Sequence, residues 1–358
     1  MLGYLKLSNH EKELVNSIYY NKNLFHKNKT NIILPPLNTF YFGYCRNALY
    51  EALVLLNVMK GDKVLLPSFI CKDLLSAINS LSAEPVFYDV NENFDLIIPP
   101  ESLPKAKVII AVNYFGFPQT LDKFKEYCSR NNCYLIEDNA HGFLSKDEYN
   151  NYLGTRGDIG IFSFRKTLPL ESGAALLINN KLIHNSLNSN SDLKYTISLK
   201  YKMKNSIRKT CAFCGLWHIY LFIYLIRMFR KIKTGNIFPV SDTSEEYILP
   251  KNKLLKDNLM NHLNNLNIES EIERRRKLYF LAEKLLINEK CIFIYKELPK
   301  NVAPYLFPFY CQPENIDSIK RKLAQNFLFC FPWPDLPQEL KNNCPDYYKN
   351  IWGVSFQW

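Results

Sequence analysis

The sequence predicts an α/β fold in which a mainly parallel central sheet lies between helices. Apolar runs of strand length alternate with helical stretches through the first half of the chain, a pattern typical of a doubly wound sheet. The chain has 358 residues with 47% hydrophobic content, enough to bury a large core. We therefore expect a large domain over residues 1–245 and a small C-terminal α+β domain over residues 246–358.

The apolar runs and helical periodicities indicate where the elements lie. The expected strands are Lys63–Leu66, Val86–Asp89, Val108–Val112, Tyr134–Ile136, Ile159–Phe164, Ala175–Ile178 and, in the small domain, Pro304–Tyr310. The expected helices are Ala48–Val58, Leu121–Arg130 and a long helical region over Asn252–Leu286.

Two of these strands run directly into ionisable side chains. One is followed by Asp138 and the other by Lys166, so both charges are expected at the carboxyl edge of the sheet, where α/β proteins build their sites. An Asp and a Lys in such positions suit pyridoxal phosphate chemistry. The Lys attaches the cofactor through its amine, and the Asp keeps the pyridine nitrogen protonated. The alternatives are a helix cap or turn for the Asp and a solvated loop charge for the Lys.

Six short motifs surround this pair in a fixed order. They are Tyr44-Cys45-Arg46-Asn47-Ala48-Leu49, Gly61-Asp62 through Pro67-Ser68-Phe69, Glu84 through Asp89, Val112 through Pro118, the Asp138 and Lys166 strands, and Glu171-Ser-Gly173-Ala-Ala. In this order, over about residues 30–190, the chain resembles the DegT–StrS type of sugar aminotransferase, a family of fold-type I pyridoxal-phosphate enzymes.

The resemblance implies a fold-type I transferase with a large cofactor-binding domain. It implies an aminotransferase that moves an amino group, from glutamate as the expected donor, to a nucleotide-linked keto sugar for surface polysaccharide or glycoconjugate biosynthesis. Lys166 is the implied catalytic residue, and Asp138 the implied partner of the pyridine nitrogen. Because active sites of the family form between two subunits, a homodimer is expected.

Further residues are expected to contact the cofactor. Helix N-terminal amides and a strand hydroxyl suit its phosphate, which points to Asn47, Ala48 and Ser163. The pyridine ring needs a stacking partner, and the candidates are His141 and Phe69, because Cys71 stands where many relatives place an aromatic residue. The structural alternatives are an ordinary helix cap for Asn47 and Ala48, a packed strand residue for Ser163 and a core histidine for His141.

The chain departs from the family pattern in two places. Ser163 and Lys166 are three residues apart instead of five, which suggests a shortened Arg-Lys loop. Lys166 is the residue chosen there, because the guanidinium of Arg165 stays protonated and cannot attach the cofactor. The family's Gly-x-Asn-x-Arg segment, which grips the phosphate of a neighbouring subunit, has no clear match around Glu246–Leu259.

The ten cysteines do not indicate disulfides or a metal site. The first residues lack the apolar core of a signal peptide, so a cytoplasmic, reduced protein is expected. Cys211-x-x-Cys214 has redox or metal spacing, but no second pair accompanies it, and we expect both thiols to pack among apolar neighbours.

The excess positive charge of +11 is concentrated in a helical segment at about residues 200–233. No acidic residue lies between Asp192 and Asp242, and the uncharged, aromatic-rich run Ala212–Ile226 is shorter than the roughly 20 residues needed to span a bilayer. Peripheral contact with an anionic membrane is one interpretation. A buried or dimer-contact helix is the other. A role in attracting a diphosphate-bearing substrate stays open. Nucleic acid is not expected, because no recognised binding module surrounds the segment.

Two rival functions stay open. A sugar dehydratase of the same fold uses the related pyridoxamine phosphate, but such relatives replace the lysine at position 166 with histidine. A non-catalytic, membrane-associated member that binds a sugar nucleotide or a partner is the second. Its support is the altered cofactor contacts and the end Trp352–Trp358, where relatives continue into another helix and apolar surface could be exposed.

Overall fold

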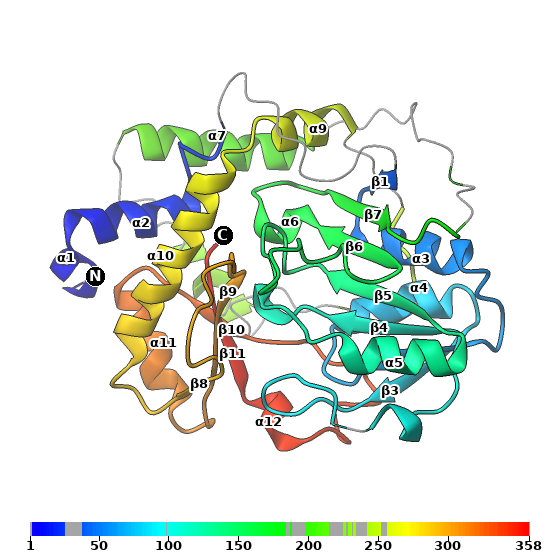
Figure 1. The fold of residues 1–358 in the computed structure, drawn as a ribbon. Helices are drawn as coiled ribbons and strands as arrows, with labels where there is room; N and C mark the ends of the chain where they lie inside the picture. The colour runs from blue at the N-terminus through cyan, green and yellow to red at the C-terminus, as the bar shows by residue number, and fades with distance from the viewer. Residues whose placement is uncertain are drawn as a thin grey trace.

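A computed structural model describes residues 2–25, 38–97, 99–183, 187, 198–214, 225–226, 228–230, 232–233, 242–251 and 256–357. This part of the chain forms a seven-stranded sheet flanked by helices and a separate four-stranded sheet (Figure 1). The mainly parallel sheet and the small antiparallel sheet expected from the sequence are both present.

The large sheet has the strand order β1-β7-β6-β5-β4-β2-β3. Its strands are β1 (Thr39–Phe42), β2 (Lys63–Pro67), β3 (Glu84–Tyr88), β4 (Val108–Val112), β5 (Tyr134–Asn139), β6 (Ile159–Ser163) and β7 (Ala174–Ile178). Neighbours from β3 to β6 pair in parallel, and β7 and β1 complete the sheet in antiparallel pairs. Every residue of β4, β6 and β7 is buried, which explains their continuous apolar sequence.

The helices surround both sheets. They are α1 (Leu2–Lys6), α2 (Asn9–Tyr19), α3 (Cys45–Leu55), α4 (Leu75–Asn79), α5 (Asp122–Asn131), α6 (Phe164–Thr167), α7 (Leu199–Phe213), α9 (Lys256–Asn264), α10 (Ile268–Leu286), α11 (Ile316–Gln325) and α12 (Asp346–Lys349), with short 3₁₀ turns at Lys72–Leu74, Pro100–Ser102, Tyr114–Gly116 and Thr243–Glu246. The predicted helical region Asn252–Leu286 is interrupted before α10, because Asn267 caps the new helix by accepting from the Ser270 amide.

The second sheet has the order β10-β11-β9-β8 and is antiparallel throughout. Its strands are β8 (Ile292–Phe293), β9 (Leu306–Tyr310), β10 (Cys330–Pro332) and β11 (Ile351–Ser355). The C-terminal strand β11 is therefore internal, and Phe356 beyond it is only 2% exposed. Ile351, Val354 and Phe356 in this segment are buried and Trp352 is half-buried, so these residues do not form the exposed apolar surface that the non-catalytic rival assumed, and Trp358 lies outside the described residues.

The N-terminal helices lie beside the helices of the second sheet. Figure 1 shows α1 and α2 next to α10 and α11, and contacts join α1 to α11 and α2 to α10. Lys284 of α10 forms an ion pair with Glu11 of α2, with 2.7 Å between nitrogen and oxygen. The division of the chain at residue 245 stays a prediction.

The predicted segment at residues 200–233 is described only in part. Helix α7 covers its first portion, whereas residues 215–224 of the predicted run Ala212–Ile226 lie outside the described residues. Among the described helices, none combines the length and the apolar character that crossing a membrane requires. Cys214 at the end of α7 is exposed, so the prediction that both thiols of the Cys-x-x-Cys pair are packed is wrong for this one.

A buried ion pair fixes the middle of the large sheet. Glu137 of β5 is completely buried, and its Oε1 atom accepts from Arg156 Nε at 2.9 Å and from Asn113 Nδ2 at 2.9 Å. The Arg156 backbone amide donates to the other carboxylate oxygen, also at 2.9 Å. Three donors thus offset the cost of burying this charge.

We predict that Glu137→Gln lowers the free energy of unfolding by about 3 kcal/mol, because it removes the charged partner that Arg156 contacts at the shortest distance and leaves only the longer contact with Asp147, 3.8 Å away. Urea denaturation measures the change. Glu126→Gln is the matched control, since its partner Arg130 is exposed and the loss should be at most about 0.5 kcal/mol. Equal losses in the two variants would contradict a structural role for the buried pair.

Candidate active site

The carboxyl ends of β5 and β6 bring the two predicted charges to one edge of the large sheet. The strands are parallel and adjacent, with Asp138 opposite Ile161. Asp138 is the second-last residue of β5, and Lys166 lies on the single turn α6 that begins directly after β6. The sheet thus places both side chains where the sequence predicted them.

Asp138 is a buried acid next to a lysine. It is 3% exposed, and its Oδ1 atom accepts from the Ala140 amide at 2.9 Å. Burial raises the pKa of the Asp138 carboxyl, although the nearby Lys166 charge opposes this shift. Among the described residues, no cation lies within 4.0 Å of the carboxylate. Within the described chain this carboxyl group therefore has no ion-pair partner of its own.

His141 joins Lys166 at this edge. Lys166 Nζ lies 3.2 Å from His141 Nε2, and the Phe115 amide donates to His141 Nδ1 at 3.3 Å. Burial, together with the Lys166 charge, lowers the pKa of His141 well below 6.5, so the ring is neutral. Because the Phe115 amide donates to Nδ1, the single ring proton belongs on Nε2, the nitrogen that faces Lys166 Nζ.

The imidazole is also held between aromatic rings. The Tyr305 ring lies 4.4 Å from it with an interplanar angle of 12°, and the Phe115 ring lies 6.0 Å away at 10°. Trp333 adds an edge contact at 5.2 Å. Tyr305 therefore already covers a face of His141, which leaves less of the imidazole for the cofactor stacking considered from the sequence.

The residues predicted for the phosphate lie at the first turn of α3 and the end of β6. Helix α3 begins at Cys45, three residues before the predicted start, and the amides of Asn47 and Ala48 donate to the Tyr44 carbonyl at 3.0 and 3.3 Å. Helix geometry therefore leaves the amides of Cys45 and Arg46, rather than those of Asn47 and Ala48, without intrahelical partners.

Side chains in these positions are buried. Asn47 is 8% exposed; its Nδ2 donates to the Pro250 carbonyl at 3.1 Å, and its Oδ1 has no partner in the described chain. Ala48 is fully buried, and Ser163, at the end of β6, is 1% exposed. Their contact with a phosphate stays a prediction.

The two candidates for the pyridine ring differ in their surroundings. Phe69 is fully buried, and its ring contacts Phe94 at 5.1 Å, Tyr348 at 4.7 Å and Trp333 at 5.1 Å. Cys71 is half-buried and lies within the electrostatic influence of Lys166, although burial raises the pKa of its thiol. Cys71 thus lies within the electrostatic influence of Lys166, whereas Phe69 is enclosed in an aromatic cluster.

Sequence reasoning missed two residues of this site, Cys45 and Tyr305. Burial and the Asp138 charge raise the pKa of Cys45 well above 9.0, against the opposing charges of Lys166 and Arg165. Tyr305 precedes β9 in the second sheet, and its amide donates to the Phe115 carbonyl at 2.8 Å. Cys45 was quoted in a motif but not assigned a role, whereas nothing near Tyr305 in the sequence indicated its position.

Arg275 of α10 connects the second part of the chain to the lysine turn. Its guanidinium, 2% exposed, donates to the carbonyls of Phe143 and Thr167 at 3.1 and 3.0 Å. Glu271 accepts from Arg275 Nε at 2.7 Å. The carbonyl that follows Lys166 is thus fixed by a buried, charge-assisted hydrogen bond.

Comparison with known proteins shows what this part of the chain is similar to. Residues 42–192 match the model of the DegT/DnrJ/EryC1/StrS aminotransferase family. GDP-perosamine synthase of Escherichia coli O157:H7 is 33% identical over 143 residues, which are 38% of this chain and 39% of that protein. The chain thus spans about two fifths of the length of the curated relative it matches. The predicted resemblance is confirmed over these residues.

Solved structures extend the likeness to the whole fold. PseC of Helicobacter pylori, an aminotransferase involved in pseudoaminic acid biosynthesis, has a TM-score of 0.60 at 13% identity and covers 98% of this chain and 91% of its own. Spr1654 of Streptococcus pneumoniae, in its PLP form, has a TM-score of 0.61 at 14% identity, with 99% and 92% covered. At these identities the likeness concerns the fold alone, and it confirms the predicted fold-type I architecture.

The site has the groups that pyridoxal phosphate requires. A primary amine and a buried carboxylate lie at adjacent strand ends, and the carboxylate has no cation of its own within 4.0 Å among the described residues. A protonated pyridine nitrogen would supply that cation. In the same part of the chain, no group of three or more histidines, cysteines or carboxylates is arranged to hold a metal ion. The residues present therefore fit the cofactor.

We predict that His141 makes the protein less stable in mild acid. The imidazole stays neutral when folded but binds a proton below about pH 6.5 when unfolded, so stability present above that pH is lost as the pH falls. Between pH 7.5 and 5.5 the loss due to His141 should be about 1 kcal/mol.

Urea denaturation of the wild type and of His141→Phe at both pH values measures this loss. The variant keeps an aromatic ring between Tyr305 and Phe115 but cannot titrate. Between pH 7.5 and 5.5, the free energy of unfolding should fall more in the wild type than in the variant. An unchanged difference would show that His141 does not titrate as its burial indicates.

Proposed function

We propose that this chain is a pyridoxal-phosphate-dependent aminotransferase that acts on a nucleotide-linked keto sugar. The observation that supports it most is the contact of Lys166 Nζ with a neutral His141, 3.2 Å away, at the same sheet edge as the buried Asp138. The family match over residues 42–192 includes all three residues. The likeness to Spr1654 in its PLP form supports the choice of cofactor.

Each residue has a separate task in this proposal. When bound, pyridoxal phosphate supplies an electron sink for negative charge that develops at the donor's α-carbon. Asp138 holds the pyridine nitrogen in its protonated form, because a buried carboxylate favours a proton nearby. Lys166 would attach the cofactor through its amine and, once released from it, would move the proton between the donor's α-carbon and the cofactor. His141 orients the lysine amine through the contact between its Nε2 atom and Lys166 Nζ.

The substrate class follows from the relatives. GDP-perosamine synthase supports a nucleotide-linked sugar as acceptor, and a product for surface polysaccharide or glycoconjugate biosynthesis is part of the proposal. Glutamate is the proposed donor, and the cytoplasm the proposed compartment. The dehydratase alternative is disfavoured because position 166 is a lysine.

The test is the absorption spectrum of the protein loaded with pyridoxal phosphate. We expect the wild type to show a cofactor band at the edge of the visible range, and glutamate to bleach it. Lys166→Ala should lack the band. Lys181→Ala is the matched control, because this lysine is exposed beyond β7 and should leave the spectrum unchanged.

Two results would count against the proposal. A wild-type protein that takes up no cofactor would favour the non-catalytic alternative. A band that persists unaltered in Lys166→Ala would show that another amine holds the cofactor, and the assignment of Lys166 would be wrong.

The proposal includes a homodimer in which α7 contacts the second copy. Three apolar side chains one turn apart on α7, namely Leu199, Met203 and Ile207, are 73%, 57% and 48% exposed. Such a stripe is more than a monomer normally leaves in water. The alternative occupant predicted from the sequence, an anionic membrane, stays open because the same helix is rich in lysine.

We predict that Met203→Glu/Ile207→Glu converts the dimer to a monomer, because it places charges in an apolar contact. Light scattering after size-exclusion chromatography gives the mass. Lys202→Gln, on the same helix, is the control and should remain a dimer. If the double variant keeps its mass but no longer sediments with phosphatidylglycerol vesicles, the stripe is a membrane contact instead.

A further inference from the structure

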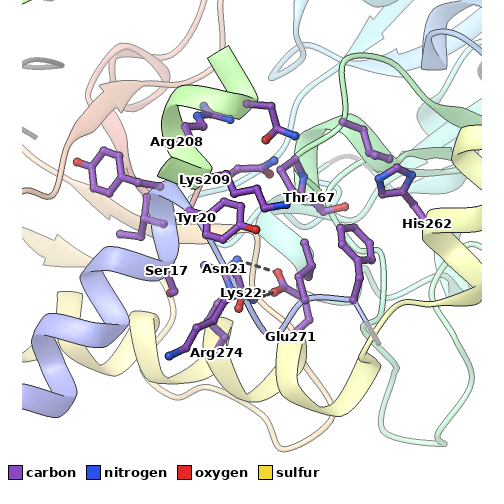
Figure 2. A pocket seen from close by; sticks show the side chains of 18 of the residues that line it. Ser17, Tyr20, Asn21, Lys22, Thr167, Arg208, Lys209, His262, Glu271 and Arg274 are labelled. Carbon is purple, nitrogen blue, oxygen red and sulfur yellow. Dashed lines mark hydrogen bonds and ion pairs between the residues drawn. The ribbon is translucent and has the colours of Figure 1, made fainter. Parts of the chain in front are cut away.

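A cavity lies beside the lysine turn and does not include Asp138, His141 or Lys166. Its volume is about 860 Å³, and it is enclosed by the end of α2, the segment after α6, one side of α7, and parts of α9 and α10 (Figure 2). Thr167 and Glu171 line it, whereas Asp138, His141 and Lys166 do not. A volume of this size is suited to a nucleotide or another drug-sized ligand.

The lining has more positive than negative charges. Four cationic side chains, Lys22, Arg208, Lys209 and Arg274, face two carboxylates, Glu171 and Glu271. These side chains come from four separate segments of the chain, and Figure 2 draws most of them around one space. The cavity therefore has an excess of positive charge that an anionic ligand would neutralise.

Both carboxylates are already engaged. Glu271 accepts from Arg274 Nη2 at 2.8 Å and from Arg275 Nε at 2.7 Å. Glu171 accepts from the hydroxyl and the amide of Ser198, at 2.5 and 3.1 Å. Neither is therefore placed to neutralise the lysines across the cavity.

Lys22 and Lys209 remain available to a ligand. Neither has an ion-pair partner among the described residues, and both side chains are exposed. Arg208, next to Lys209 on α7, is 5% exposed and lines the same cavity. Burial lowers the pKa of Arg208 to about 10, so the guanidinium keeps its charge at neutral pH.

One side of helix α7 faces the cavity. Tyr201, Asn205 and Arg208 line it. At 100° per residue these three positions lie on the side of the helix opposite to the exposed apolar stripe of Leu199, Met203 and Ile207. The cavity and the proposed dimer contact therefore do not compete for the same side chains.

The remainder of the lining suits a ring system with hydroxyl groups. Tyr20, Phe25 and His262 contribute aromatic surface. Gln357 also lines the cavity, and its Oε1 atom is buried without a hydrogen-bond donor in the described chain. A ribose hydroxyl or a base amino group would provide that donor.

We propose that this cavity binds the nucleoside diphosphate part of the nucleotide-linked sugar, an assignment of ligand that rests on the proposed function. Lys22, Lys209 and Arg208 contact the diphosphate, and the nucleoside lies against the aromatic side chains with a donor to Gln357. Since Thr167 belongs to both the cavity wall and the lysine turn, the bound nucleotide lies next to the residue that follows Lys166.

Isothermal titration calorimetry with GDP at low ionic strength tests this proposal. We expect wild-type protein to bind GDP and Lys22→Gln/Lys209→Gln to bind it at least about 10-fold more weakly, since each lost charge-assisted contact to a phosphate is worth roughly 1.5 kcal/mol or more. Both lysines are exposed, so the variant should fold. Lys202→Gln removes the same charge from α7 outside the cavity and should bind GDP as the wild type does.

Competition experiments distinguish the contact with the diphosphate from the contact with the nucleoside. Pyrophosphate should displace GDP from the wild type, and guanosine alone should do so much less effectively. Absence of GDP binding, or equal binding by the double variant and the wild type, would overturn the proposal. Displacement by guanosine but not by pyrophosphate would also overturn it.

The outcome is independent of the cofactor test. The cofactor band and its loss in Lys166→Ala require no nucleotide, so a protein with that band but without GDP binding retains the proposed chemistry and loses only this cavity's role. A protein that binds GDP through these lysines but takes up no cofactor retains the cavity's proposed role and loses the proposed chemistry.

Discussion

The ion pair between Glu137 and Arg156 is the constraint on which the candidate site depends. Successive side chains of a strand point to opposite faces, so fixing Glu137 from one side also fixes the direction of Asp138 on the other. The Arg156 guanidinium also donates to Asn113 Oδ1 at 2.9 Å, which joins the ends of β4 and β5. A polar network behind the sheet therefore orients the acid in front of it.

The site is completed by the second part of the chain. Arg275 fixes the backbone after Lys166, and Tyr305 both contacts His141 and donates its amide to Phe115. Neither residue belongs to the large sheet. The strand ends supply the two charged groups, and elements that follow residue 256 determine their surroundings.

The sequence predicted the central strands of the large sheet because β4, β6 and β7 are buried along their whole length, whereas the edge strand β1 was not predicted. Continuous apolar runs such as Val108–Val112 and Ala174–Ile178 admit few other interpretations, and their charged ends indicated Asp138 and Lys166. The start of α3 was misplaced because Tyr44 caps it without a side-chain hydrogen bond, so no capping residue marks the boundary. Tyr305 and the cavity lining could not be found, since both are made by contacts between segments far apart in the sequence.

The contact between Tyr305 and Phe115 has a consequence for how the protein would lose activity. The Phe115 amide determines which nitrogen of His141 carries the proton, and the same residue is tied through its carbonyl to the strand that leads into the second sheet. A small separation of the two sheets would free the imidazole to change tautomer while both sheets stay folded. The chemistry proposed for this site would thus depend on how closely the two sheets are docked, more than on the stability of either one.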